Sequence, residues 1–453
     1  RVGGSRQFGE QWAFSISSAL QSQGSPEVSS IQPFVSSIDL ASSNEYTGRS
    51  FETWYERLLY DTERSGLRLY EAKSNADRSE ITLVVANREY LLFADAIRKF
   101  LDLAELHLPN SYRAINIVLN ENGIQPITVS YLRNGFAGQE WLPRSQGQLD
   151  ILPGREILRP DNQTVFDLGR LSFTANVGTR FQIFDPDNPL RHQLNLTLGA
   201  SSRLGMGWFL RSSYIVDIDN NFDEISRDSD SVLPHVRSDA ARYLREGASG
   251  LESFYLARRD NLSNDVFYRL YGGILEEMYS GIGGELLYQP FRSRLAYGLS
   301  FNWVKQRVYD KSFRHLDYST TTAFGSLYWA TPFYNYDVAI HAGQFLAKDI
   351  GAKFEVRRTM DNGWMIGAWA TLTDVPFEDF GEGSFDKGIY LKIPLQGMVP
   401  GNTRTSYSTG IRSLQRDGGQ MLESYSGVLW HALRAARYDA LGQNRHRMVE
   451  GYD

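Results

Sequence analysis

The stretch RLAYGLSFNW (294–303) alternates between large apolar residues and small or polar ones at every step. One parity carries the large side chains: Leu295, Tyr297, Leu299, Phe301 and Trp303. The other parity carries alanine, glycine, serine and asparagine. Because successive side chains of a strand point to opposite faces, the stretch predicts a strand with one apolar face and one small or polar face.

About 14 segments with this alternation follow one another from residue 164 onward. They are 164–184, 190–201, 205–217, 250–259, 264–274, 278–289, 291–307, 317–331, 334–346, 350–358, 363–373, 387–394, 404–414 and 419–430. Short connections alternate with longer ones, of which 218–249 and 374–386 are long. Asn362-Gly363 signals a hairpin of type I′. The pattern predicts an antiparallel meander.

Short turns at one end and long loops at the other are how outer-membrane barrels are built, and lipid then covers the apolar face. We therefore expect a mainly β fold, a transmembrane antiparallel β-barrel over residues 164–430. It would have about 14 strands in this chain and about 16–18 or more in a complete protein. Asn362-Gly363 would lie at the periplasmic rim, and the loop 374–386 on the extracellular side.

Residues 48–135 show a helical period followed by short strands, twice over. Ser50 can cap a first helix, Gly66 can end it, and Asn87 can cap a second helix. This α-β-β arrangement, repeated once, predicts a small α/β domain that enters the barrel from the periplasmic, short-turn side.

The remaining segments have weaker signals. Residues 136–163 are expected to be a linker, and 431–453 a periplasmic C-terminal tail that forms an amphipathic helix. Residues 1–47 are ambiguous between a linker and two further strands, QWAFSISSAL and IQPFVSSIDL.

The composition excludes several classes of function. The chain of 453 residues has a net charge of −6 and no basic stripe, so nucleic acid is not an expected partner. It has no cysteine, which excludes disulfides, thiolate metal sites and thiol nucleophiles. No run of 18 apolar residues suggests a membrane-spanning helix. The seven histidines are scattered without a metal-binding pair, so neither a metal nor a cofactor is expected.

The stretch FEDFGEGSFDKGIYLKIPL (377–395) has the glycines and the lysine of a phosphate loop but not their spacing, and a strand pattern follows Lys387 instead of a helix. Three aromatic residues give the preceding acidic loop apolar anchors: Phe377, Phe380 and Phe385. We therefore interpret it as a constriction loop that folds into the barrel mouth, with Phe380 and Phe385 packed inward and with Asp386 and Lys387 against the wall.

Two further motifs have alternative readings. DIDNNFDEISRD (217–228) begins like a calcium loop, but Phe222 stands where a glycine is needed and Asp228 where a glutamate is needed, so a solvated acidic loop is favoured. His341 could pair with a serine of a neighbouring strand in a barrel hydrolase. A polar histidine in the lumen is the favoured interpretation.

The alternation also assigns charged side chains to the lumen, because a charge that faces lipid at mid-depth costs about 2–4 kcal/mol. Lys353, Glu355 and Arg357 are expected inside, with Ala352, Phe354 and Val356 toward lipid. The candidates for lumen lining and glycan contact are Arg269, Tyr271, Glu277, Glu285, Lys353, Glu355, Arg357 and Lys392. Two roles stay open for them, a ladder of paired charges or a lining for carbohydrate.

Five stretches, taken together, resemble one protein family. They are SDSVLPHVRSD (229–239), YSGIGGELLYQP (279–290), FLAKDIGAKFEV (345–356), NGWMIGAWATLTDVPF (362–377) and FGEGSFDKGIYLKIPL (380–395). They are similar to the YjbH-type exopolysaccharide proteins of the Gram-negative outer membrane. The resemblance implies an outer-membrane barrel that takes part in export of exopolysaccharide or capsule, beside periplasmic and lipoprotein partners of that pathway. It implies no catalytic residues. Members are generally longer at the N-terminus, so we expect strands before Arg1.

These observations lead to one hypothesis with two alternatives. The chain would serve polysaccharide export from the outer membrane, as a pore or a scaffold, with polysaccharide and outer-membrane lipid as partners and without enzymatic activity. A barrel enzyme that modifies lipid or glycan is one alternative. A structural anchor for periplasmic assembly factors is the other.

Overall fold

The computed structural model describes residues 54–133, 144–166, 169–183, 190–205, 207–221, 231–380, 385–398, 401–412, 417–423 and 425–449. These residues form two compact units. The larger unit comprises the described residues of 167–399 and 405–432, and the smaller unit those of 22–166, 400–404 and 433–453. The two possible N-terminal strands lie outside the described residues.

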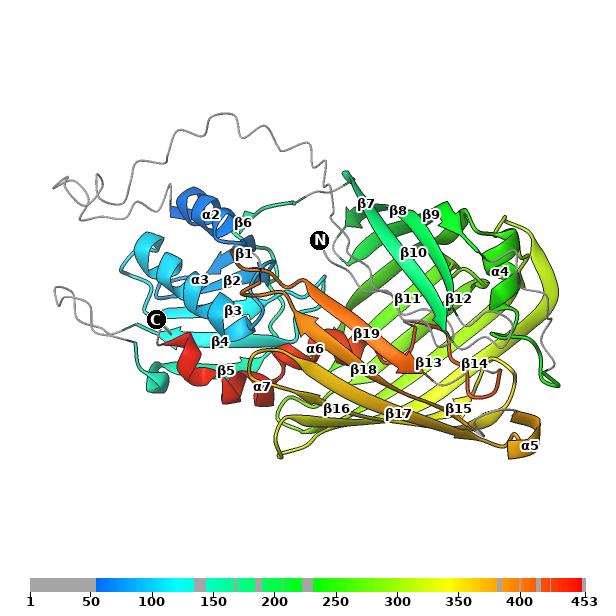
Figure 1. Cartoon of the computed structure of the whole chain (residues 1–453). Coiled ribbons are helices and arrows are strands. Elements are labelled where there is room, and N and C mark those ends of the chain that lie inside the picture. The colour runs from blue at the N-terminus through cyan, green and yellow to red at the C-terminus, as the bar shows by residue number, and fades with distance from the viewer. Residues whose placement is uncertain are drawn as a thin grey trace. The chain divides into compact units, whose positions relative to one another are not determined.

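The larger unit is built on one antiparallel sheet of 13 strands, in which each strand pairs with the next one along the chain (Figure 1). The strands are β7(Leu171–Ile183), β8(Leu190–Gly205), β9(Trp208–Asn220), β10(Gly250–Ser263), β11(Val266–Ile274), β12(Tyr279–Tyr288), β13(Leu295–Arg307), β14(His315–Ala330), β15(Tyr336–Gln344), β16(Ile350–Thr359), β17(Met365–Thr373), β18(Asp386–Pro394) and β19(Ser406–Arg412). The mainly β, antiparallel fold is thereby confirmed.

The sheet curves strongly, but its described strands do not form a closed ring (Figure 1). Among the strands that the structure describes, β7 pairs only with β8, and β19 only with β18. The described part of the chain is therefore a curved sheet with two edges. No described helix is long and apolar enough to cross a membrane.

The prediction of a fourteenth strand at 419–430 is wrong. Its described residues form irregular backbone that leads into α6(Val428–Leu433). Gly419 and Gly427 adopt left-handed backbone conformations, with φ of 70° and 71°, which interrupt an extended chain. Its apolar residues are buried against several loops and strands rather than paired in a ladder.

The hairpin at Asn362-Gly363 exists, but its turn is not type I′. A type I′ turn needs positive φ at both central residues, and only Gly363 has it, with φ of 82°. Five residues, 360–364, join β16 to β17. The Gly363 amide donates to the Met360 carbonyl at 2.8 Å.

The smaller unit contains a six-stranded sheet with the order β5-β4-β3-β2-β1-β6. Its elements are α2(Trp54–Arg64), β1(Leu67–Ser74), β2(Glu80–Asn87), α3(Phe93–His107), β3(Ala114–Leu119), β4(Ile127–Leu132), η2(Gln146–Gln148), β5(Leu149–Pro153) and β6(Asn162–Gln163). The expected order of helix, strand and strand occurs twice. Helix α3 is the crossover between the parallel strands β2 and β3. Asn87 caps a turn before α3 rather than the helix itself, because its Oδ1 accepts from the Tyr90 amide at 2.9 Å.

The interpretation of 136–163 as a linker is corrected by β5 and β6, which extend the small sheet on both sides. Leu149 and Ile151 of β5 are buried, and the Thr164 amide after β6 donates to the Tyr70 carbonyl at 2.7 Å. Strands of two to five residues carry too little alternation to be recognised in the sequence.

The tail is not one amphipathic helix. After α6 it forms η4(Arg434–Ala436), α7(Tyr438–Gln443) and η5(Arg445–Met448), because Arg437 is extended, with ψ of 158°. These short helices belong to the smaller unit from Leu433 onward. There the Arg447 Nε lies 3.2 Å from the Asp95 Oδ1 of α3.

Candidate functional site

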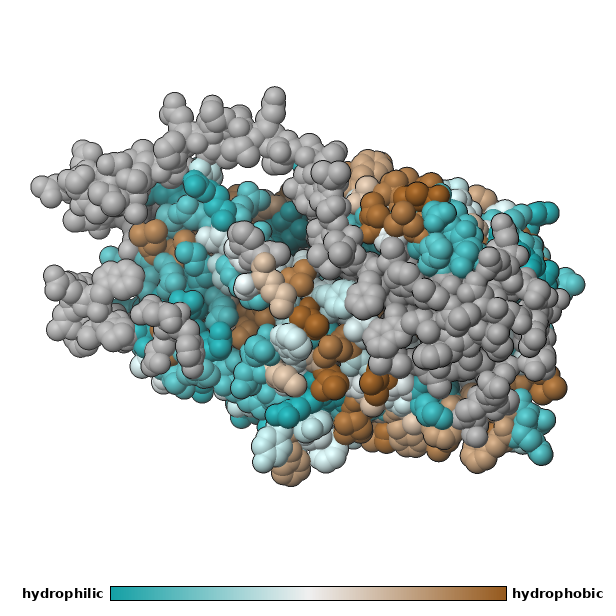
Figure 2. Space-filling model, in the orientation of Figure 1, coloured by the Kyte–Doolittle hydropathy of each residue, from teal (hydrophilic) through white to brown (hydrophobic). Residues whose placement is uncertain are grey.

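The two faces of the 13-stranded sheet differ in chemistry as the sequence predicts. On β13, Leu299 is 62 % exposed, while Asn302, three residues later and on the opposite face, is 0 % exposed. We call the face of Leu299 the outer face and the face of Asn302 the inner face. Figure 2 shows apolar residues gathered over visible parts of the strands. Large apolar side chains are thus exposed, and small or polar ones are buried.

Most of the expected lumen residues lie on the inner face, and several contact side chains of adjacent strands. Arg269, Tyr271, Glu285, Glu355 and Arg357 are buried there, whereas Phe354 and Val356 are exposed on the outer face. Lys353 and Lys392 are half-buried. Glu277 is buried in the link between β11 and β12.

Their contacts are those of a structural ladder. The Arg357 Nη2 lies 3.1 Å from the Asp337 Oδ2 of β15. The Tyr390 hydroxyl donates to the Glu355 Oε1 at 2.6 Å. Arg269 lies directly opposite Glu285 in the β11–β12 register. Contact of any of these residues with glycan stays a prediction.

Residues 417–430, which we call the inner segment, lie along the inner face instead of forming a strand. In their described part, the Gly419 amide donates to the Asp349 Oδ2 at 2.7 Å, and the Leu429 amide donates to the Glu285 Oε1 at 3.2 Å. The Trp430 ring stacks on that of Tyr328 with centroids 4.8 Å apart. The expected lining residue Glu285 is therefore already occupied by the chain's own backbone.

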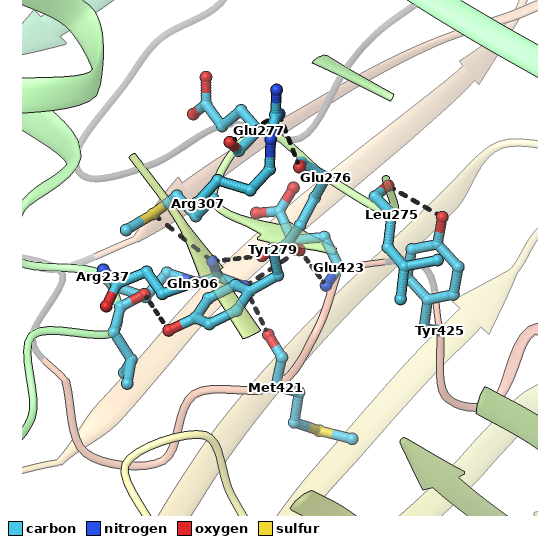
Figure 3. A network of polar contacts seen from close by, with 12 residues as sticks. Arg237, Leu275, Glu276, Glu277, Tyr279, Gln306, Arg307, Met421, Glu423 and Tyr425 are labelled. Atoms are coloured by element: carbon cyan, nitrogen blue, oxygen red, sulfur yellow. Dashed lines mark hydrogen bonds and ion pairs between the residues drawn. The ribbon is translucent and has the colours of Figure 1, made fainter. Parts of the chain in front are cut away.

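A buried ion pair connects the inner segment to two loops (Figure 3). Arg237 is 1 % exposed, and its two terminal nitrogens lie 2.5 and 3.1 Å from the carboxylate oxygens of Glu276. Arg237 also donates to the Met421 carbonyl at 3.0 Å, and the Glu423 amide donates to Glu276 at 3.0 Å. The arrangement holds the segments around 237, 276 and 421 together.

An apolar core surrounds this ion pair at one end of the inner face. Its buried members include residues of loops, of strand ends and of the inner segment: Val236, Tyr243, Leu275, Met278, Leu346 and Leu422. A second buried ion pair joins Lys311 to Glu277 at 2.9 Å. We call this end, where β9–β10, β11–β12 and β15–β16 are connected, the closed end.

The expected constriction loop lies at this end, between β17 and β18, and its role as a constriction stays a prediction. It contains α5(Phe377–Phe380), and Phe380 is buried so close to Gly418 that a Cβ there would lie 2.6 Å from its ring. Phe377, the first residue of this helix, is 64 % exposed, so the expectation that it anchors the loop is wrong. Gly381 and Gly383 lie outside the described residues.

The C-terminal end of that loop contacts the neighbouring strand β17. The Asp386 Oδ2 accepts from the Trp369 Nε1 at 3.0 Å and from the Thr371 hydroxyl at 3.3 Å. The Lys387 Nζ lies 4.2 Å from the centroid of the half-buried Phe385 ring. Lys387 thus lies in strand β18 and contacts the aromatic ring of Phe385, and it is not part of a phosphate loop.

His341 does pair with a serine of a neighbouring strand. Its Nδ1 lies 2.8 Å from the Ser326 hydroxyl, its direct cross-strand neighbour. Both side chains are buried on the inner face. The imidazole ring of His341 is covered by Tyr328 of β14 and by Gly427 of the inner segment. Among the described residues no carboxylate hydrogen-bonds to His341, and the pair is a buried cross-strand contact.

Metal ligands are not assembled in the part of the chain that the structure describes. Asp217 of the acidic stretch accepts from the Gln193 Nε2 at 2.7 Å. Residues 222–228 of that stretch lie outside the described ranges.

Sequence reasoning missed two arginines of the inner face, Arg211 on β9 and Arg259 on β10. Both guanidinium groups lie over the ring of Phe209, at 5.3 and 4.9 Å from its centroid. Their strand parity, the same signal that assigned Arg269 to the inner face, would have found them.

Comparison with known proteins agrees with the resemblance noted in the sequence. The family model described as "Exopolysaccharide biosynthesis protein YbjH" matches residues 1–434. A relative from Escherichia coli (strain K12), named "Uncharacterized lipoprotein YjbH", is 31% identical over 334 residues, which are 70% of this chain and 47% of the relative. The chain thus spans about half the length of this curated relative. It belongs to the YjbH family of exopolysaccharide biosynthesis proteins.

Proposed function

We propose that the chain acts in exopolysaccharide production as a lipid-embedded wall of the outer membrane with a filled interior. The observation that carries the proposal is the inverted arrangement of β13, with Leu299 and Phe301 exposed and Ser300 and Asn302 buried. Such a strand suits lipid outside and polar packing inside. The family supports the pathway, and the lipoprotein name of the relative supports an envelope location.

A belt of aromatic side chains supports the membrane placement. Exposed aromatic residues stand on the outer face next to the β8–β9, β12–β13 and β14–β15 turns: Trp208, Tyr288, Tyr297, Trp329 and Tyr336. We call this end, opposite the closed end, the turn end. Tyrosine and tryptophan are enriched where a membrane meets water, which supports our proposal that the turn end lies at one interface. Lipid does not tolerate open sheet edges, so we propose that further strands close the sheet into a barrel.

The filled inner face favours a scaffold over a permanently open pore. The inner segment and the apolar core of the closed end occupy the space that a polymer would need. Polysaccharide would then be handled from the turn end, and the smaller α/β unit would contact periplasmic partners of the pathway. We propose no enzymatic step, since the buried Ser326–His341 pair offers no access to a substrate.

The membrane placement is tested by one matched pair of substitutions. Phe354→Arg puts a charge on the outer face of β16, at an expected cost of about 2–4 kcal/mol in lipid. Phe377→Arg puts the same charge on a side chain that is exposed on α5. We expect Phe354→Arg to reduce the amount of folded protein in purified outer membranes strongly and Phe377→Arg to leave it unchanged. Equal amounts of the two variants would contradict the lipid-facing wall.

A further inference from the structure

The inner face of β9, β10 and β11 carries more positive charge than the described carboxylates neutralise. Arg259 lies directly opposite Arg269 in the β10–β11 register, and Arg211 lies opposite Tyr255 in the β9–β10 register. Like charges that face each other on adjacent strands destabilise a sheet. The nearby Glu285 also accepts from the Leu429 amide, so it does not serve the arginines alone.

Several other charges of the larger unit's interior are paired with an opposite charge. Arg357 pairs with Asp337 at 3.1 Å, Lys311 with Glu277 at 2.9 Å, and Arg237 with Glu276. In contrast, neither Arg211 nor Arg259 has a carboxylate at ion-pair distance among the described residues, and the Arg259 Nε is a buried donor without an acceptor. A buried donor without an acceptor costs free energy, which a bound acceptor would recover.

The position and the neighbours of these arginines suit a ligand. The Arg259 amide donates to the Gly207 carbonyl in the β8–β9 turn, so Arg259 lies near the turn end, while Phe209 and Tyr255 also pack against the apolar core. Arg211 is exposed. Both guanidinium groups lie over the Phe209 ring, and Tyr255 is the cross-strand neighbour of Arg211. Guanidinium forks match carboxylates in geometry.

We propose that Arg211 and Arg259, together with Phe209, bind a carboxylate-bearing sugar of an acidic polysaccharide. The inference rests on the proposed function and names the class of polymer that would be bound near the turn end. Each guanidinium would donate to the carboxylate oxygens, and the Phe209 ring beneath both groups would hold them in position.

The test is a binding measurement on the full chain in lipid nanodiscs. The probes are oligogalacturonate and a neutral dextran oligomer of matched length. The variants are Arg211→Gln/Arg259→Gln and, as the matched control, Arg358→Gln on the outer face, where Arg358 lies over Tyr336. We expect oligogalacturonate to bind the unaltered chain and the control alike, the double variant to bind it about tenfold more weakly or worse, and dextran not to bind.

A thermal midpoint separates a ligand site from a structural role. The double variant removes like-charge repulsion, so its midpoint should be unchanged or higher. A lowered midpoint would show that the arginines hold the wall together and would overturn the inference. So would equal binding of oligogalacturonate by the double variant, equal binding of dextran, or full displacement by millimolar inorganic phosphate, which would assign the site to phosphate.

The two proposals fail in different ways. A chain that enters the membrane, as measured with the Phe354→Arg pair, but does not bind oligogalacturonate loses only the acidic-sugar site. A chain that does not enter the membrane loses the proposed function, whatever it binds.

Discussion

The two sheets of this protein place their apolar residues in opposite ways. In the small sheet, Leu83 on β2 and Ile117 on β3 are fully buried beneath helices or neighbouring strands. In the large sheet, Leu299 on β13 is exposed, and its neighbours Ser300 and Asn302 are buried. The same residue type is therefore stabilised by burial within the chain in one sheet and, on our proposal, by lipid in the other. The comparison teaches that exposed apolar side chains on a sheet indicate that the face is covered by lipid rather than by water.

The largest expected effect comes from the closed end of the large sheet, where charged side chains are buried together with apolar ones. Glu276→Gln leaves Arg237 buried without a full counter-charge, and breaking a buried pair on one side costs about 3–5 kcal/mol. We expect a clear drop in resistance of the larger unit to denaturant, measured from urea unfolding in micelles. The control Glu378→Gln changes an exposed glutamate of α5. A stability equal to that of the control would mean that the pair does not hold the closed end.

A matched truncation in both sheets sharpens the comparison directly. Leu83→Ala removes a fully buried side chain and should destabilise the smaller unit by about 2–5 kcal/mol. Leu299→Ala shortens a side chain that is mostly exposed, so we expect about 0.5 kcal/mol or less in a membrane. Denaturant unfolding followed by proteolysis of each unit checks both values. Equal losses would break the proposed contrast between the sheets.

The smallest expected effect is a pH dependence at the closed end. The His235 Nδ1 lies 3.0 Å from the Asp239 Oδ1, its Nε2 lies 3.2 Å from the Ser231 carbonyl, and Asp417 stands nearby. Burial opposes protonation of His235, but the hydrogen bond and charge of Asp239 outweigh it and raise its pKa above the usual value. The raised pKa means that protonated His235 stabilises the fold.

This stability is fully present below the unfolded pKa of about 6.5 and is lost as pH rises through the higher folded pKa. We therefore expect faster amide exchange around residues 235–239 at pH 8.5 than at pH 6, after correction for intrinsic rates. His235→Gln should remove the difference. A pH dependence that survives this substitution would assign it to another group.

Much of the large sheet could be predicted from the sequence because a strand's period of two is a local property. The segment 291–307 contains β13, and 350–358 nearly coincides with β16. The inner segment could not be predicted, because Leu422 and Tyr425 owe their burial to residues far away in the chain. The alternation at 419–430 resembles that of a strand, and only the positive φ of Gly419 and Gly427 excludes one.

The candidate site was predictable only in part, for the same reason. Strand parity places Arg269 and Glu355 on the inner face, but it does not say which charges have partners. The importance of Arg237 depends on Glu276 and Met421, and that of Arg259 on facing Arg269 across the sheet. Both depend on register and on tertiary contacts that a single sequence does not display.

The network in Figure 3 also has a consequence for the order in which the chain folds. The Arg237 amide bonds to Asp417 across 180 residues of sequence, and the Glu423 amide bonds to Glu276 across 147. Contacts this remote require the closure of very long loops, which is slow. Hairpins between successive strands close only short loops and form early. The inner segment would therefore be enclosed at the last stage of assembly. Truncation before residue 417 should leave the hairpins intact while it prevents the final compaction of the larger unit.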